Sequence, residues 1–316
     1  MPEATVGLAR KGNRRDNVYA ALDLVRQEVT PKIAEQVLLK PNFLSSTNTL
    51  SSTQADAIRG AIDFLLSTPR PPGEILIAEG GNEKESGDAF KNFGFHALQD
   101  EYKVPIRLVD LNQETRWETT SIFLNDGTEY QVHMPRTVLD CPCTLSVAVA
   151  KTHDVCVVTL ALKNMIMGTI RKEDRVKMHG FMTHKERLRP QESQAITINL
   201  IRVAKFLSPD ISVIDGTMGI QGNGPDGTDA VALGVAAASA DVFAADAVMA
   251  KVMGYEPLDL GLLYYGNHLG IGIADLQNIN VLGTPIDDVQ TSVKHHDWIE
   301  DQRQWRKPDA MSRIQA

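Results

Sequence analysis

Residues 145–153 have the sequence Leu-Ser-Val-Ala-Val-Ala-Lys-Thr-His. The first six residues predict a buried strand, and Lys151 and His153 lie at its end. A second apolar run, residues 155–162, leads to Lys163. Lysine is rarely buried without a partner. One lysine at the end of a buried segment would most often lie in solvent, but two of them beside a histidine indicate a pocket or a fixed anion.

Strand and helix patterns alternate around this stretch. The predicted strands are 36–39, 74–78, 106–110, 144–150, 211–214, a small-residue strand before Asp241, and 279–282. The predicted helices are 13–28, 54–66, 84–93, 193–206, 242–253 and 258–268. Such alternation is typical of α/β proteins. Residues 121–134, with Asn125-Asp126-Gly127 at the centre, predict an inserted β-hairpin. The expected fold class is therefore α/β, a mostly parallel sheet flanked by helices.

The length of 316 residues accommodates one large or two modest domains. We expect a single unit over residues 1–300, or two lobes (about 1–140 and 141–300) around a cleft. The C-terminal residues 301–316 are polar and predict a loosely held tail.

Composition excludes several classes of protein. The net charge of -8 and the pI of about 5.5 argue against a nucleic-acid or anionic-membrane binder. No run approaches the ~20 apolar residues of a membrane span, and no apolar segment follows the basic N-terminus as in a signal peptide. The three cysteines form neither an evident disulfide set nor the spacing of a ferredoxin cluster. We expect a cytoplasmic protein.

Basic and amide side chains follow the predicted strands directly. Ligands of parallel sheets gather at the carboxyl ends of the strands, where these side chains would meet. Three lysines would hold a carboxylate or a phosphate, and two asparagines would donate hydrogen bonds. Together with Lys151, the ligand-binding residues expected here are Lys40, Asn42, Glu79, Lys163 and Asn164.

A glycine-rich segment follows the strand at 211–214. Asp215 and Gly216 begin it, and Gly222 and Gly224 lie further along. Its glycines would let backbone N–H groups approach an anion, but a loop with several left-handed turns would need the same residues. The pattern matches neither a dinucleotide-binding nor a Walker A motif, so we expect no nucleotide.

Histidines supply candidates for proton transfer. His153 or His179 is expected to act as general acid or base, and Lys151, if desolvated, as a base or an imine-forming amine. The same histidines with His184 and a carboxylate would also suit a divalent metal, although their spacing forms no compact motif. We therefore assign no metal ligands and leave a divalent metal open.

Two aspartates flank the predicted helix at 242–253. Asp241 precedes it and is expected to be its N-cap. Asp246 lies among alanines, where an inward carboxylate needs a partner, and a salt bridge to one of the lysines is the simplest expectation. The same helix could also pack against a second subunit, so a homo-oligomer is left open.

The ordered set of these motifs resembles the domain of unknown function 362 family over roughly residues 35–285. The motifs are Lys40-Pro41-Asn42, Ala150-Lys151-Thr152-His153, Leu162-Lys163-Asn164-Met165 with Gly168, Asp215-Gly216 with Gly222, Gly224-Pro225 and Gly227, and Ala240-Asp241 with Ala245-Asp246-Ala247. Many relatives carry a four-iron ferredoxin module, whose cysteine motifs this chain lacks, so an iron–sulfur cluster is not expected. The loop at Glu79-Gly80-Gly81 departs from the Gly-Asp/Glu-Ser type. The resemblance implies a fold and a site, but no reaction.

These patterns favour an intracellular enzyme that acts on a small anionic molecule in a cleft lined by Lys, His and Asn. The polar segment 171–189 would form a flap over it. Two alternatives are a metal- or redox-dependent protein, as in iron–sulfur-linked relatives, and a non-catalytic small-molecule binding protein.

Overall fold

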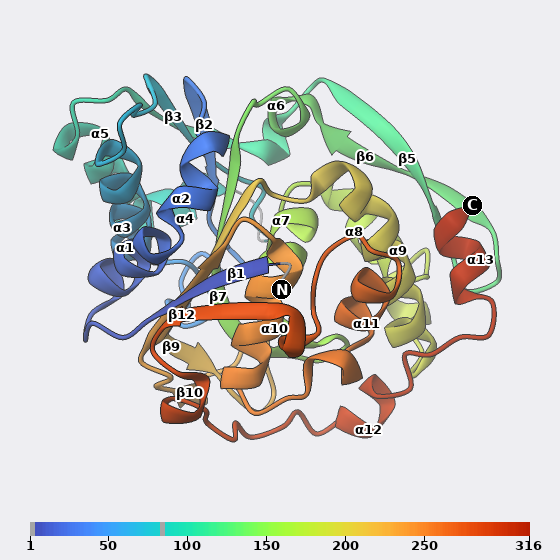
Figure 1. Ribbon diagram of the computed structural model, residues 1–316. Helices are drawn as coiled ribbons and strands as arrows, with labels where there is room; N and C mark the ends of the chain where they lie inside the picture. Colours follow the sequence, from blue (N-terminus) through green and yellow to red (C-terminus); the bar gives the residue numbers. More distant parts are fainter. Residues whose placement is uncertain (1–3, 83–85) are drawn as a thin grey trace.

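One mixed, mostly parallel sheet lies between two layers of helices in the computed structural model, which describes residues 4–82 and 86–316 (Figure 1). The strands are β1 (Ala4–Ala9), β2 (Gln36–Lys40), β3 (Glu74–Glu79), β4 (Ile106–Asp110), β5 (Trp117–Phe123), β6 (Glu129–Pro135), β7 (Thr144–His153), β8 (Val157–Thr159), β9 (Ile211–Ile220), β10 (Ala230–Val231), β11 (Val235–Ser239) and β12 (Ile279–Gly283). The α-helices are α1 (Arg14–Leu24), α2 (Arg26–Val29), α3 (Ala55–Leu66), α4 (Ser86–Asn92), α5 (Leu98–Glu101), α6 (Arg136–Leu139), α7 (Ala161–Met167), α8 (Arg175–Met178), α9 (Gln191–Leu207), α10 (Val242–Val252), α11 (Gly261–His268), α12 (Ile299–Gln302) and α13 (Ala310–Gln315).

The sheet has the strand order β12-β1-β11-β9-β7-β2-β3-β4, with β10 paired to β9 and β8 paired to β7. The central strands β9, β7, β2, β3 and β4 are all parallel, whereas β11 is antiparallel to both of its neighbours. Because the central strands point the same way, their carboxyl ends share one edge of the sheet. Candidate ligand-binding residues at several of these ends are thereby brought together.

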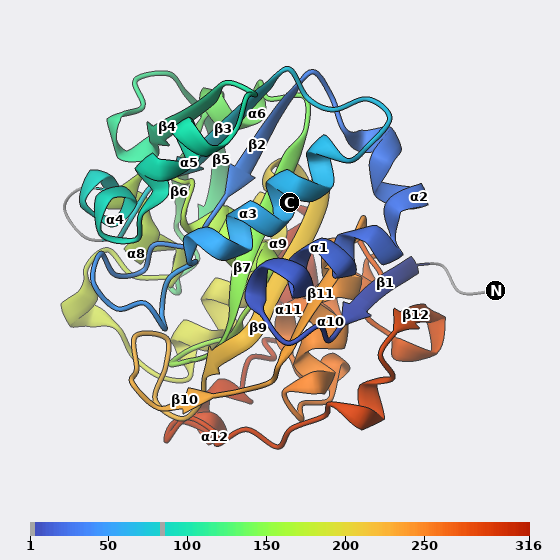
Figure 2. The same cartoon turned by 90° about the vertical axis from the view of Figure 1, so that its left-hand side faces the viewer.

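The sheet separates two apolar cores. Strand β7 contributes Leu145 and Val147 to the core under α1 and α3, and Ala148 and Ala150 to the core under α7, α9 and α10. This alternation follows from the two-residue period of a strand, and burial on both faces explains why the sequence there is continuously apolar. Figure 2 shows α1 and α3 crossing the face of the sheet that is turned toward the viewer.

The α/β fold class predicted from the sequence is confirmed, as is the inserted hairpin. Strands β5 and β6 pair antiparallel in a separate sheet. Strand β1 escaped prediction, because Thr5 and Gly7 interrupt its apolar pattern. The helix expected at 84–93 corresponds to α4, but Lys84 and Glu85 lie outside the described residues.

The C-terminal residues are not loosely held, contrary to the prediction. Trp305 and Ile314 are buried, and α13 packs against α9. Trp305 Nε1 donates to the carbonyl of Asp259 at 2.8 Å, and Lys205 Nζ donates to that of Ile314 at 2.9 Å. A few apolar residues in a polar segment were enough to anchor it.

Among the helices of residues 4–82 and 86–316, none combines the length and the apolar character that a bilayer crossing requires.

Candidate functional site

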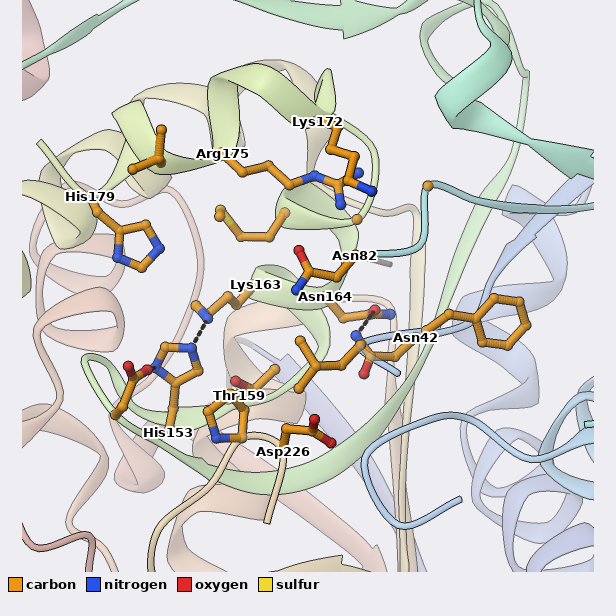
Figure 3. Close-up of a pocket in the computed structure, with 18 of the residues that line it drawn as sticks. Asn42, Asn82, His153, Thr159, Lys163, Asn164, Lys172, Arg175, His179 and Asp226 are labelled. Atoms are coloured by element: carbon orange, nitrogen blue, oxygen red, sulfur yellow. Dashed lines mark hydrogen bonds and ion pairs between the residues drawn. The ribbon is translucent and has the colours of Figure 1, made fainter. Parts of the chain in front are cut away.

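A cavity of about 670 Å³ opens at the carboxyl edge of the central strands. Strand β7, the short strand β8 and helix α7 form its floor, and the segment around α8 forms the opposite wall. Figure 3 shows Arg175 and Lys172 on one side, and His153, Thr159 and Asp226 on the other. Seven of the residues predicted for the site line this cavity: Asn42, Glu79, Lys151, His153, Lys163, Asn164 and His179.

Lys40, predicted as an anion ligand, is fully buried and does not line the cavity. Its ammonium forms an ion pair with Glu79 and donates to Asn164 Oδ1 at 3.2 Å. Burial lowers the pKa of Lys40 and raises the pKa of Glu79, while the attraction between the two opposes both shifts. Lys40 therefore supports the site from beneath. A Cβ at Gly168 would collide with its ammonium, which explains the glycine.

The amide groups of Asn164 and Asn42 link Lys40 to Lys151. Asn164 Nδ2 donates to the backbone carbonyl of Lys40 at 3.2 Å and to Ser146 Oγ at 3.0 Å, so its Oδ1 faces Asn42. Asn42 Nδ2 donates to this oxygen at 3.0 Å, and Asn42 Oδ1 then accepts from Lys151 Nζ at 2.6 Å. The backbone thus fixes the orientation of both amides and of the lysine.

Lys151 is 1% exposed and has only oxygen acceptors of neutral groups around its Nζ, namely Asn42 Oδ1 and the carbonyl of Ser51 at 2.5 Å. Burial, followed by the nearby positive charge of Lys163, lowers the pKa of Lys151 to about 7. Such an amine exchanges protons near neutral pH, as a general base or nucleophile requires.

His153 and Lys163 form a short polar contact, with 2.5 Å between His153 Nε2 and Lys163 Nζ. His153 Nδ1 accepts from the backbone N–H groups of Val155 at 2.9 Å and Cys156 at 3.3 Å. Asp154 Oδ1 also lies 3.0 Å from His153 Nδ1. The two backbone N–H groups favour the tautomer with its proton on Nε2, whereas the carboxylate favours the proton on Nδ1, so the direction of the His153–Lys163 hydrogen bond depends on the tautomer. Burial lowers the pKa of His153 well below its usual value and also lowers the pKa of Lys163.

His179 lies at the end of the α8 segment, with its Nδ1 2.5 Å from Glu192 Oε1. Burial lowers the pKa of His179, although Glu192 opposes the shift. Arg187 also pairs with Glu192 and approaches Asp154 at 3.3 Å. Both histidines thus have a carboxylate oxygen near Nδ1, from Glu192 for His179 and from Asp154 at 3.0 Å for His153, but His153 also contacts the basic Lys163.

Several cavity-lining residues were not predicted: Asn82, Asp154, Thr159, Lys172, Arg175, Arg187 and Asp226. Arg175 belongs to the segment interpreted as a flap, and its charge alone did not distinguish it from its basic neighbours. The hydroxyl of Thr159 is buried at the cavity wall and has no hydrogen-bond partner among the described residues.

The glycine-rich segment does not form part of the cavity wall at the positions predicted. Gly216 belongs to β9, which extends to Ile220, and neither Gly222 nor Gly224 lines the cavity. Asp215 is buried and pairs with Arg14. Gly224 packs so closely on the carbonyl of Thr152 that a Cβ there would collide with it. The glycines serve close packing, and Pro225 and Asp226 after them reach the cavity.

Asp241 is the N-cap of α10, as predicted, since its Oδ1 accepts from Phe243 N at 2.9 Å. The salt bridge expected for Asp246 is wrong. Its carboxylate accepts from the backbone N–H groups of Ala161 at 2.8 Å and Leu162 at 3.2 Å, at the start of α7. Burial raises the pKa of Asp246 to about 7. Helix α10 therefore positions the helix that carries Lys163.

Substituting Asp246→Ala should lower the free energy of unfolding by about 2 kcal/mol, because two buried N–H groups lose their acceptor. Chemical denaturation measures the change. Asp287→Ala is the matched control, since Asp287 is exposed and should change stability by less than about 0.5 kcal/mol. Equal stability of the two variants would contradict the assigned capping role.

Among the described residues, no group of three His, Cys, Asp or Glu side chains is arranged to hold a metal ion. The histidines named for that alternative instead have other contacts: His153 with Lys163, and His179 with Glu192. A divalent metal at the site stays an untested expectation.

Helix α10 is buried along most of its length against β9, β11 and α7 of the same chain. The face that the sequence left open for a second subunit is therefore covered within the chain.

Comparison with known proteins gives matches of different strength. A thylakoid-associated protein from Synechocystis sp. is 26% identical over 251 residues, which cover 76% of this chain and 70% of that protein. Two solved structures resemble part of the fold. A Thermotoga maritima protein has a TM-score of 0.45 and 11% identity, covering 65% of this chain and 51% of that one. The lactate racemase apoprotein from Thermoanaerobacterium thermosaccharolyticum has a TM-score of 0.42 and 10% identity, covering 74% and 54%. The chain thus spans about half the length of each of these two solved structures.

A family model described as a domain of unknown function (DUF362) matches residues 37–251, which contain β7 and α7, the elements that carry Lys151, His153 and Lys163, and most of β2 and α10. Since the match covers more than half of the sequence, the chain belongs to this family.

Proposed function

We propose that the protein is an enzyme that binds a small anionic molecule, bearing a carboxylate or a phosphate, in the cavity at the carboxyl edge of the sheet. Arg175, Lys151 and Lys163 hold the anion, and the His153–Lys163 pair moves protons. Asn42 and Asn164 orient Lys151. The expected compartment is the cytoplasm, which the three free cysteines support.

One observation carries the proposal: three basic side chains at the cavity have no carboxylate partner among the described residues. Lys151 contacts an amide oxygen and a carbonyl, and Lys163 contacts an imidazole. Arg175 donates to the carbonyls of Ile170 and Gly81 at 3.3–3.4 Å. Lys40, by contrast, is buried and paired with Glu79. An anionic ligand would supply the negative charge that these three groups lack.

The position of Arg175 supports its role as the permanent cation. A guanidinium stays charged at all physiological pH values, even though burial lowers the pKa of Arg175. Burial, in contrast, lowers the pKa of both lysines, so a bound anion would favour their protonated forms. Binding of the anion would then be coupled to proton uptake.

Isothermal titration with malonate and with inorganic phosphate tests the binding step. We expect the wild-type protein to bind at least one of them, and Arg175→Gln to weaken that binding by about tenfold to a hundredfold, because a charge-assisted hydrogen bond is lost. Arg70→Gln, which changes an exposed arginine, should bind as the wild type does. No binding of either anion, or equal affinity in Arg175→Gln, would refute the proposal.

A non-catalytic binding protein would use the same cavity, and His153 separates the two functions. If the protein is an enzyme, His153→Gln should abolish turnover of the substrate, once found, and leave anion affinity within a few-fold. If it only binds, the same variant should have no turnover to lose.

A further inference from the structure

We infer that Lys151 is a nucleophilic amine that forms an imine with the carbonyl group of an oxo acid. This inference rests on the proposed anion-binding cavity, leaves the anion to Arg175 and Lys163 while Lys151 acts as the neutral nucleophile, and names the substrate class: a ketone or aldehyde that also bears a carboxylate.

The hydrogen bonds of Lys151 carry the argument. A neutral amine has two N–H bonds and one lone pair, whereas an ammonium has three N–H bonds. Lys151 Nζ has two acceptors, Asn42 Oδ1 at 2.6 Å and the carbonyl of Ser51 at 2.5 Å. Neither is a carboxylate. Among the described residues there is no third acceptor, so the set matches a neutral amine whose lone pair remains available to the cavity that Lys151 lines.

The acceptors cannot turn away, because the surrounding network fixes them. Asn42 Oδ1 faces Lys151 because its Nδ2 is bound to Asn164 Oδ1 at 3.0 Å. Ser51 presents a backbone carbonyl, which has no alternative rotamer. An amine held by two fixed acceptors has its lone-pair direction set in advance, which is the positioning that nucleophilic catalysis needs.

Lys163 lacks this arrangement of two fixed acceptors and a free lone pair. Its Nζ lies 2.5 Å from His153 Nε2, a titratable group that can exchange a proton with it, rather than against two fixed neutral acceptors. The pair is instead suited to supply a proton. Of the two lysines that line the cavity floor, Lys151 is therefore the nucleophile and Lys163 with His153 is the proton donor.

The chemistry balances without an added oxidant or reductant. The lone pair of Lys151 Nζ forms a C–N bond to the carbonyl carbon, and the C=O π pair moves to oxygen, which takes a proton from the His153–Lys163 pair. The resulting carbinolamine loses its hydroxyl group as water after a second protonation by the pair. The two protons that nitrogen releases return to the pair, so the net products are the neutral imine and one water. Arg175 would hold the carboxylate, and the unpartnered Thr159 hydroxyl on the opposite side of the cavity (Figure 3) is available to accept or donate one further hydrogen bond.

Reductive trapping tests the inference on the intact chain. The protein is incubated at pH 7 with pyruvate, glyoxylate or glycolaldehyde, reduced with borohydride, and analysed by intact mass and peptide mapping. At that pH about half of Lys151 is neutral, against about one in two thousand of an exposed lysine with a pKa near 10.4, so Lys151 should be labelled ahead of the exposed lysines. We expect one adduct per chain, on Lys151, with the oxo acids labelling faster than the neutral glycolaldehyde.

Peptide mapping of the wild-type protein identifies the labelled lysine even if a variant misfolds. Lys151→Met should lose the adduct, and Lys103→Met, which changes an exposed lysine, should keep it. An adduct on Lys163, labelling spread over exposed lysines, or no adduct with any probe would overturn the inference. Labelling by glycolaldehyde but not by the oxo acids would overturn the substrate class.

A malonate titration run in parallel separates this inference from the proposed function. Malonate binding without trapping would leave the anion-binding cavity in place and overturn the imine. Trapping on Lys151 without malonate binding would support the nucleophile and count against the cavity as an anion site.

Discussion

Replacing Lys40 by methionine is expected to lower the free energy of unfolding by about 3–5 kcal/mol, because it leaves Glu79 buried without its partner. Both side chains are almost fully buried, and the carboxylate also accepts from the backbone N–H of Phe43 at 3.3 Å. With the lysine gone, Glu79 keeps its charge only at a high desolvation cost, or takes up a proton.

Urea denaturation at pH 7 and pH 5 measures this effect. The loss should be smaller at pH 5, because protonation of Glu79 is easier there and removes the unpaired charge. The double variant Lys40→Met/Glu79→Gln should recover part of the loss, since it removes both charges together. Lys103→Met is again the exposed control. A loss below about 1 kcal/mol in Lys40→Met would show that the pair contributes little to stability.

The central strands and the gathering of their end residues were predictable from the sequence because both depend on local patterns. Continuous apolar runs give buried parallel strands, and parallel strands place their carboxyl ends together. That reasoning placed Lys151 and His153 at the cavity. Lys163 and Asn164, also expected at strand ends, reach the cavity from helix α7 instead.

The roles within that group were not predictable, because they depend on partners far away in the sequence. Lys40 and Lys151 both end buried strands, but only Lys40 faces the carboxylate of Glu79. Asp215 is paired with Arg14, which lies 201 residues away. Asp246 caps α7 from another helix, and no spacing rule connects them. The polar residues of the site could be identified in the sequence, but the pairs in which opposite charges neutralise each other could not.

A predicted loop that proved to be strand illustrates the same limit. The glycines after Asp215 suggested a loop, but β9 continues through Gly216 and Gly219 to Ile220. Small residues are needed there because Gly219 and Gly224 lie directly against the backbone of β7. Close packing and anion binding both favour glycine, and only the neighbouring strand distinguishes them.

Between pH 7 and pH 10, the wild-type protein is expected to gain stability relative to Lys151→Met, by up to about 4 kcal/mol. Burial and the charge of Lys163 lower the pKa of Lys151 to about 7 in the folded protein, whereas the unfolded chain has the ordinary value near 10.4. Between these values the unfolded chain binds more protons, so the free energy of unfolding rises with pH. Below pH 7 the full cost of burying the charged lysine is present.

Denaturation of both proteins at pH 7, 8, 9 and 10 measures the difference in unfolding free energy at each pH, and subtracting the variant removes the titration of most other groups. Lys40 and Lys163 titrate in both proteins, and Lys163 should regain part of its affinity for protons once Lys151 is gone, which makes 4 kcal/mol an upper figure. For Lys103→Met the difference from wild type should not depend on pH. A flat difference for Lys151→Met would mean that Lys151 stays charged in the folded protein. Asn42 Oδ1 and the Ser51 carbonyl would then accept hydrogen bonds from an ammonium group. An ammonium has no lone pair, so the rapid imine formation expected of Lys151 would not occur.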